Sequence, residues 1–99
     1  MRILGLDVGD KTIGIAVSDS LFLTAQGIEV IRRTSLNKDL ERLGQIIVEY
    51  EIGTIVVGLP KNMNGTIGPR GELVQQFGRI LEERFPNMKS CFWDERLST

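Results

Sequence analysis

Residues 3–18 read ILGLDVGDKTIGIAVS, and this stretch predicts two strands joined by a tight turn. Residues 2–8 form an almost continuous apolar run interrupted by Asp7, a pattern typical of a strand covered on both faces. Residues 9–11, Gly-Asp-Lys, have the composition of a turn. Residues 12–18 alternate strictly between large apolar residues and small ones, which is the period of a strand. The short link predicts that the two strands form an antiparallel hairpin.

The rest of the chain predicts further strands and two helices. Ser35 suits the N-cap of the first helix, and Gly53 suits the residue just past its end. Pro86 is expected to end the second helix. We expect a third strand, a helix, a strand, a helix and a last strand at residues 26–32, 36–50, 54–58, 73–85 and 89–93. Strand–helix–strand units are normally parallel crossovers. The fold class is therefore an α/β mixed five-stranded sheet, with three antiparallel strands followed by parallel strands and with flanking helices.

Length and composition indicate one globular domain over residues 1–99. The chain is 41% hydrophobic and 25% charged, and its one cysteine, Cys91, excludes an internal disulfide. A zinc site is not expected, because the sequence has no histidine and no second cysteine. The N-terminus lacks the apolar stretch of a signal peptide or a membrane span, so we expect a soluble cytoplasmic protein with no membrane partner.

The net charge of −1 argues against a passive nucleic-acid coat but not against a nucleic-acid enzyme. Basic residues can be concentrated locally even when the total charge is close to zero. The candidates for such a patch are Arg32, Arg33, Lys38, Lys61, Arg70 and Arg96. Their alternative interpretation is scattered solvated charge.

Carboxylates at two strand ends are the first candidate site. Asp7 stands in an apolar strand, where a carboxylate needs a partner or a metal, and alternatively it caps the following turn. Asp94 and Glu95 end the last strand, and their alternative interpretation is a charge run at a helix entrance. If the first and last strands lie side by side, these acids meet at one sheet edge. Such a cluster favours a divalent cation, and magnesium suits an all-oxygen site.

The second candidate is the turn-rich loop of residues 60–71. It follows a predicted strand and carries amides and cations that suit phosphate, although it lacks the ending of a P-loop. Its alternative interpretation is a plain connection, but its length favours function.

Three motifs together resemble a known family. They are DVGDKTIGIA at residues 7–16, GLPKNMNG with GPR at residues 58–65 and 68–70, and WDERLST at residues 93–99. In this order, and over the whole chain, they resemble the YqgF family, also called RuvX, bacterial proteins described as Holliday junction resolvases or pre-16S rRNA nucleases. The resemblance implies an RNase H-like fold related to RuvC. It also implies metal-dependent phosphodiester hydrolysis with Mg²⁺ or Mn²⁺, in rRNA processing and ribosome biogenesis or in DNA recombination.

The resemblance also assigns roles to residues. It implies that catalysis and metal binding fall to Asp7, Asp94 and Glu95. It implies that nucleic acid is bound by Lys11, Lys61, Asn62, Asn64, Arg70 and Arg96. Family members continue into a C-terminal helix with another acid, so we expect a domain truncated at Thr99 that is inactive or weakly active by itself. RNase H enzymes place an acid near the strand that here reads VVGL at residues 56–59, and this chain has none there.

Two other functions remain open from the sequence. The first motif also resembles the phosphate-binding hairpin of actin-like ATPases and sugar kinases, which clasp a nucleotide between two such domains. A non-catalytic RNA-binding module is the third possibility. The sequence does not choose between precursor RNA and branched DNA as the partner, nor between a monomer and a homodimer.

Overall fold

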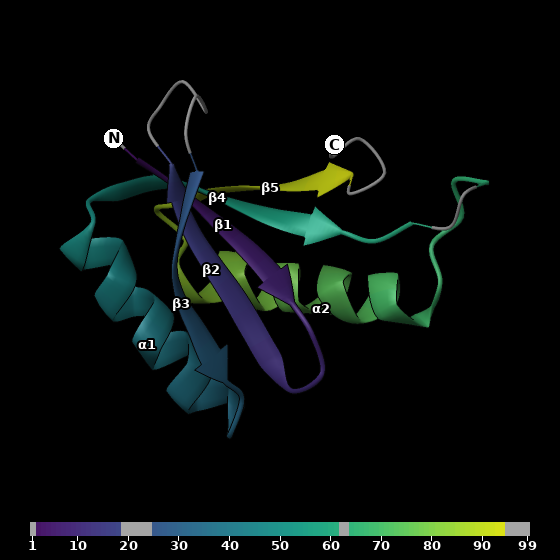
Figure 1. Cartoon of the computed structure of the whole chain (residues 1–99), viewed down its shortest axis with the longest axis horizontal. Coiled ribbons are helices and arrows are strands. Elements are labelled where there is room, and N and C mark those ends of the chain that lie inside the picture. The colour runs from purple at the N-terminus through teal and green to yellow at the C-terminus, as the bar shows by residue number, and fades with distance from the viewer. Residues whose placement is uncertain (1, 19–24, 62–63, 95–99) are drawn as a thin grey trace.

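The computed structural model describes residues 2–18, 25–61 and 64–94, and these residues form five strands and two helices that follow one another in the predicted order (Figure 1). The elements are β1 (Arg2–Val8), β2 (Thr12–Ser18), β3 (Ala25–Arg32), α1 (Leu36–Glu49), β4 (Ile52–Leu59), α2 (Pro69–Arg84) and β5 (Lys89–Asp94). The strands form one sheet in the order β3-β2-β1-β4-β5. The predicted mixed α/β sheet is therefore confirmed.

Strand directions follow the predicted division. β1 pairs antiparallel with β2 and β2 pairs antiparallel with β3, whereas β1 pairs parallel with β4 and β4 pairs parallel with β5. The condition under which the acids of the first and last strands would meet directly is not fulfilled: β1 and β5 are not side by side, because β4 lies between them. The crossover through α1 returns the chain next to β1, and the crossover through α2 then adds β5 outside β4. Both β1 and β5 still end at the same edge of the sheet (Figure 1).

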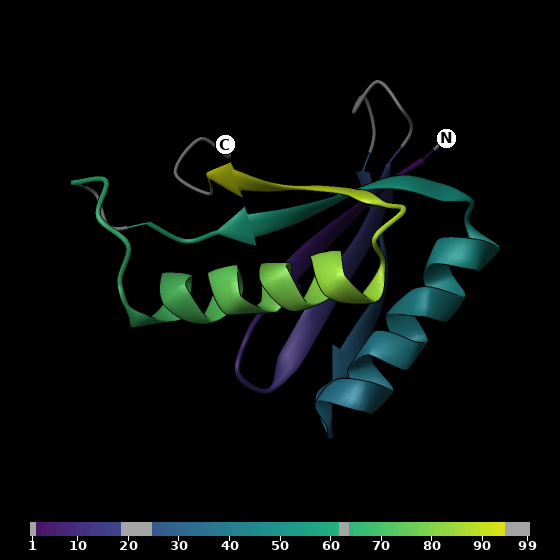
Figure 2. The same ribbon diagram turned by 180° about the vertical axis from the view of Figure 1, so that it is seen from behind.

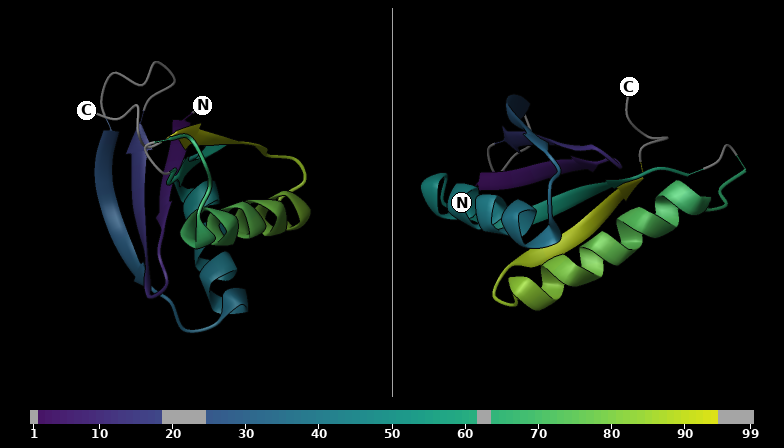
Figure 3. Two further views of the ribbon diagram at one scale, coloured as in Figure 1. Left: turned by 90° about the vertical axis from the view of Figure 1, so that its right-hand side faces the viewer. Right: turned by 90° about the horizontal axis from the view of Figure 1, so that it is seen from below.

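Both helices cover the same face of the sheet (Figures 2 and 3). The two crossovers move across the sheet in the same direction, and right-handed connections then place both helices on one side. The core lies between this face and the helices. It comprises Leu4, Leu6, Val8, Ile13, Ile15, Ile31, Leu40, Leu43, Ile46, Ile52, Ile55, Val57, Leu59, Val74, Phe77 and Leu81.

The opposite face of the sheet is open in the part of the chain that the structure describes. The expectation that β1 is covered on both faces was therefore wrong. Burial alternates along the strand, with Leu6 and Val8 buried and Asp7 between them exposed. Alternating burial is the pattern of a sheet with helices on one side.

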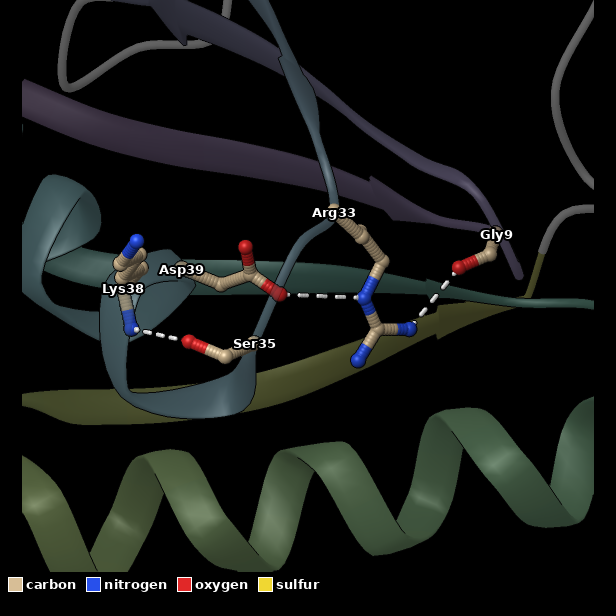
Figure 4. Close-up of polar contacts among 5 residues, drawn as sticks. All are labelled: Gly9, Arg33, Ser35, Lys38 and Asp39. Carbon is tan, nitrogen blue, oxygen red and sulfur yellow. Dashed lines mark hydrogen bonds and ion pairs between the residues drawn. The ribbon is translucent and has the colours of Figure 1, made fainter.

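The ends of α1 test two predicted caps. Ser35 is confirmed as the N-cap, since its hydroxyl accepts a hydrogen bond from the amide of Lys38 at 3.3 Å (Figure 4). Gly53 was wrongly expected just past the helix, because it lies inside β4. The chain leaves α1 through Tyr50 and then through Glu51, which takes the left-handed conformation with φ 54°.

The start of α2 shortens the predicted loop. The helix begins at Pro69, so residues 69–71 are its first turn rather than loop. Proline suits this position, because its missing N–H has no partner in the first helical turn. Gly71 is buried there, and a Cβ on it would lie 2.9 Å from the carbonyl oxygen of Pro60. The helix therefore packs its first turn tightly against the end of β4.

Candidate nucleic-acid site

Asp7 lies in a row of residues that crosses the open face. The register pairs Asp7 with Gly14 of β2 and Leu6 with Val57 of β4. The next residue of β4, Gly58, pairs with Trp93 of β5. Asp7, Gly58 and Trp93 all line one hollow on this face. Trp93, rather than Asp94, is thus the β5 residue in the row of Asp7.

The hollow has a volume of about 1050 Å³ and a floor of small residues. Its sheet floor includes Gly5, Gly14, Ala16, Gly27 and Gly58. Glycines on a strand allow a ligand to approach the backbone closely. The exposed carboxylate of Asp7 stands in this floor, so the expectation of a carboxylate buried in the strand was wrong. The carboxylate is open to solvent, where a bound ion or water can reach it.

Arg70 brings a cation to the same hollow. It stands in the first turn of α2, is exposed, and lines the hollow together with Asp7. Its Nη2 lies 3.8 Å from the position that a Cβ on Gly9 would take, two residues after Asp7. The structure therefore brings together two residues that the sequence places 63 positions apart.

The other predicted site residues are placed less completely. Lys11 is exposed in the β1–β2 turn, and Lys61 is half-buried just past β4. The side-chain oxygen of Asn64 accepts hydrogen bonds from the backbone N and Oγ1 of Thr66, at 3.1 and 2.7 Å, so it shapes its own loop. Asn62, Glu95 and Arg96 lie outside the described residues.

Asp94 ends β5, where it pairs with Leu59, at the edge where β1 also ends. Over the described residues, no group of three or more metal-ligating side chains comes together. The predicted centre of Asp7, Asp94 and Glu95 therefore stays a prediction.

A second cluster was missed by the sequence analysis. Arg33, grouped there with the candidate patch, points inward between the sheet and the helices (Figure 4). Its Nε donates to Oδ2 of Asp39 at 3.3 Å and its Nη1 donates to the carbonyl oxygen of Gly9 at 2.9 Å. Its guanidinium carbon lies 5.4 Å from the ring centre of Phe77. The available signal was Asp39, a charged residue within the apolar stripe of α1, where it needs a partner.

A surface ion pair ties β3 to α1. Nη2 and Nε of Arg42 donate to Oε1 and Oε2 of Glu29 at 2.6 and 2.9 Å. This bidentate bond with Arg42 holds the pKa of Glu29 below its ordinary value.

Solved structures share this fold. The RuvC resolvase of Thermus thermophilus in complex with a Holliday junction superposes with a TM-score of 0.65 at 15% identity, over 97% of this chain and 66% of that chain. The resolvase of fowlpox virus with Holliday junction DNA gives 0.55 at 16% identity, over 100% and 64%. A propionate kinase from Francisella tularensis gives 0.59 at 13% identity, over 92% and 36%. The chain thus has the RNase H-like fold of RuvC-type resolvases, a fold that kinases also contain.

Sequence comparison defines the family within that fold. The profile described as "RuvX: Holliday junction resolvase" matches residues 1–99, and the chain belongs to this family. Relatives carrying the name "Putative pre-16S rRNA nuclease" are 62% identical in Clostridium botulinum and 60% identical in Carboxydothermus hydrogenoformans. Both alignments cover all of this chain, and 72% and 71% of those relatives. The predicted resemblance is confirmed. In the part of the chain that the structure describes, neither helix is long and apolar enough to cross a membrane.

Proposed function

We propose that this chain carries the cutting site of a cytoplasmic nuclease that hydrolyses phosphodiester bonds, with Asp7 as its central carboxylate. The observation that supports this most is the joint placement of Asp7 and Arg70 around one open hollow. A carboxylate alone repels a phosphate, and a neighbouring cation offsets that repulsion. The glycine floor leaves space for a nucleic-acid backbone beside them.

A divalent cation fits the Asp7 side of the hollow. The carboxylate offers oxygen ligands, is exposed, and has only glycine opposite it in β2. Mg²⁺ or Mn²⁺ suits such a site, since magnesium usually keeps several waters and takes few protein ligands. Asp7, with Asp94 and Glu95, would hold the ion. Once bound, it would supply an activated water and charge stabilisation for the leaving oxygen.

The cations of the site bind and orient the substrate in this proposal. Arg70 offers a planar pair of donors to a phosphate, which suits bidentate binding. Lys11 is exposed at the same hairpin end. Further contacts to the substrate are proposed for Lys61, Asn62, Asn64 and Arg96. This arrangement positions a backbone phosphate across the ends of β1 and β4.

The substrate we propose is the 5′ region of precursor 16S rRNA. The name that the relatives at about 60% identity carry supports it. A Holliday junction is the second candidate, supported by the family description and by the RuvC likeness. The kinases among the solved structures are 13–16% identical to this chain, and an ATP-binding role has less support because the family description and the relatives' names point to a nuclease instead.

Cleavage assays on three substrates test the proposal. A labelled precursor 16S RNA, a four-way DNA junction and a plain duplex are incubated with the chain in Mg²⁺, Mn²⁺ or EDTA. We expect metal-dependent cutting of the RNA. We expect Asp7→Asn to lose at least about 100-fold in rate, whereas Asp10→Asn, an exposed acid in the same hairpin but outside the hollow, keeps the wild-type rate.

Metal binding is measured on the same variants, since it can be followed without any substrate. Mn²⁺ should broaden the NMR signals around Asp7 in the wild type and in Asp10→Asn, but not in Asp7→Asn. Equal cutting by Asp7→Asn, or equal broadening, would remove Asp7 from the site. Saturable ATP binding without cutting would favour the kinase-like alternative.

A further inference from the structure

We propose that Arg33 is a positioning residue that fixes the turn after Asp7 and thereby the direction of the Asp7 carboxylate. The importance of that direction rests on the proposed function, which makes Asp7 the reacting carboxylate. Arg33 lies just past β3, on the far side of β2 from Asp7, and it is not among the residues that line the hollow. Its role is carried through the turn.

Arg33 donates hydrogen bonds to two backbone carbonyl groups of the turn, residues 9–11. The amide of Gly9 donates to the carbonyl of Thr12 at 2.8 Å and closes the hairpin. The backbone amide of Arg33 donates to the carbonyl of Lys11 at 2.9 Å, and its Nη1 donates to the carbonyl of Gly9 at 2.9 Å. One residue therefore binds both ends of the turn. Gly9 follows Asp7 by two residues, with only Val8 between them. The hydrogen bonds at Gly9 therefore fix the backbone close to the residue that carries the carboxylate.

The guanidinium is itself anchored on both helices. Its Nε donates to Asp39 of α1, whose side chain is only 3% exposed (Figure 4), and its guanidinium carbon lies over the ring of Phe77 of α2. A guanidinium is planar and carries five donors in a rigid fork, so it makes these contacts together. A lysine keeps the charge for Asp39 but has no fork and no plane. The turn is thus tied to α1 and α2 by the shape of arginine, not by charge alone.

The same turn also lies close to Arg70, the residue proposed to bind phosphate. Arg70 Nη2 lies 3.8 Å from the Cβ position of Gly9, and a Cβ there would also lie 3.2 Å from the carbonyl of Thr12. A shift of the turn moves Asp7 relative to Arg70, whereas Arg70 itself is carried by α2 and not by the turn. Removing the Arg33 contacts should therefore affect the chemical step more than the binding of substrate.

Hydrogen exchange measures how firmly the turn is held, without any assumption about activity. Arg33→Ala and Arg33→Lys are compared with Arg79→Ala, an exposed arginine of α2. We expect the Gly9 amide to exchange at least about 10-fold faster in both Arg33 variants, with the Leu6 and Ile15 amides of the same hairpin unchanged. Unchanged exchange at Gly9, or equal acceleration at all three amides, would overturn the proposal. If Arg33→Ala does not fold, Arg33→Lys alone decides.

Cleavage kinetics then connect the turn to the chemistry. We expect Arg33→Lys to lower kcat about 10-fold with KM within two-fold of the wild type, and Arg79→Ala to leave both within two-fold. A folded Arg33→Lys with wild-type kcat would also overturn the proposal. If the wild type itself does not cut, the proposed function fails, and the exchange rates at Gly9 alone decide whether Arg33 fixes the turn.

Discussion

Asp7 and Gly14 face each other across the first hairpin, and a Cβ on Gly14 would lie 3.6 Å from the Cβ of Asp7. The glycine leaves one flank of the carboxylate free. A contact of 3.6 Å is ordinary van der Waals packing, so a Cβ fits at position 14 without distorting the backbone. It would, however, fill the space that a metal ion or phosphate needs. A substitution at Gly14 can therefore restrict access to the Asp7 carboxylate without lowering the stability of the hairpin.

We predict that Gly14→Val folds at least as stably as the wild type but binds Mn²⁺ about 10-fold more weakly. Valine favours strands, and replacing glycine lowers the entropy of the unfolded chain, which together outweigh the new contact. Thermal unfolding measures the first quantity and Mn²⁺ titration the second. Gly14→Ala is the matched control, and its Mn²⁺ affinity should lie between those of the wild type and Gly14→Val. Wild-type Mn²⁺ affinity in Gly14→Val would show that this flank of Asp7 is not used.

Two glycines of α2 predict opposite outcomes for the same substitution. A Cβ on Gly71 would clash with Cγ2 of Ile67 and would lie 2.9 Å from the carbonyl oxygen of Pro60, whereas a Cβ on Gly78 would clash with the ring end of Phe92. The backbone at Pro60 has little room to move, but Phe92 is 42% exposed and its ring can turn.

We therefore predict that Gly71→Ala lowers the free energy of unfolding by about 1–3 kcal/mol, as overpacking does. Gly78→Ala should stay within about 1 kcal/mol of the wild type, because the gain in helix propensity offsets the displaced ring. Urea unfolding of both variants gives the comparison. A smaller loss in Gly71→Ala than in Gly78→Ala would contradict this account of the packing at the start of α2.

Local patterns predicted the order of the elements well, because each rests on neighbours in the chain. The alternation of residues 12–18, the N-cap at Ser35 and the stop before Pro86 all depend on local geometry. Whether the second face of β1 is covered depends instead on where the helices lie. An apolar strand with small neighbours looks the same in either case, so the exposure of Asp7 was not visible from its own segment.

Strand adjacency and the inward turn of Arg33 depend on long-range geometry. The sequence gives two parallel additions but no rule for their order, and β4 took the place next to β1. Arg33 and its neighbour Arg32 look alike in the chain, yet only the position of Asp39 in α1 distinguishes them. Of the candidate site, Asp7 and Arg70 line one hollow, which no local pattern indicated, while the roles of Asp7, Arg70, Asp94 and Glu95 stay predictions.

The ion pair of Glu29 and Arg42 predicts a pH dependence. The hydrogen bond from Arg42 lowers the pKa of folded Glu29 below 4.5, so the unfolded chain binds more protons in that range. The stability from this pair is present above about pH 4.5 and is lost as the pH falls through the folded pKa. Thermal unfolding between pH 7 and pH 3 should show a smaller loss of Tm in Glu29→Gln than in the wild type. Glu83 is an exposed acid on α2, and Glu83→Gln should lose Tm with pH as the wild type does. A Glu29→Gln curve identical to that of the wild type would contradict the prediction.

Arg70 and Arg84 stand at opposite ends of α2, and only Arg70 lines the hollow with Asp7. If Arg70 binds a phosphate, its loss removes one released counterion when nucleic acid binds. We predict that Arg70→Ala weakens RNA binding and lowers the slope of log K against log salt by about 0.7–0.9 units, the effect of one phosphate contact. Arg84→Ala, in the last turn, removes the same charge away from the hollow and should leave the slope unchanged. The slope is measured by fluorescence anisotropy of RNA binding between about 50 and 200 mM salt. This range of ~4-fold is wide enough to resolve such slopes. Equal slopes in both variants would mean that the start of α2 is not a phosphate site.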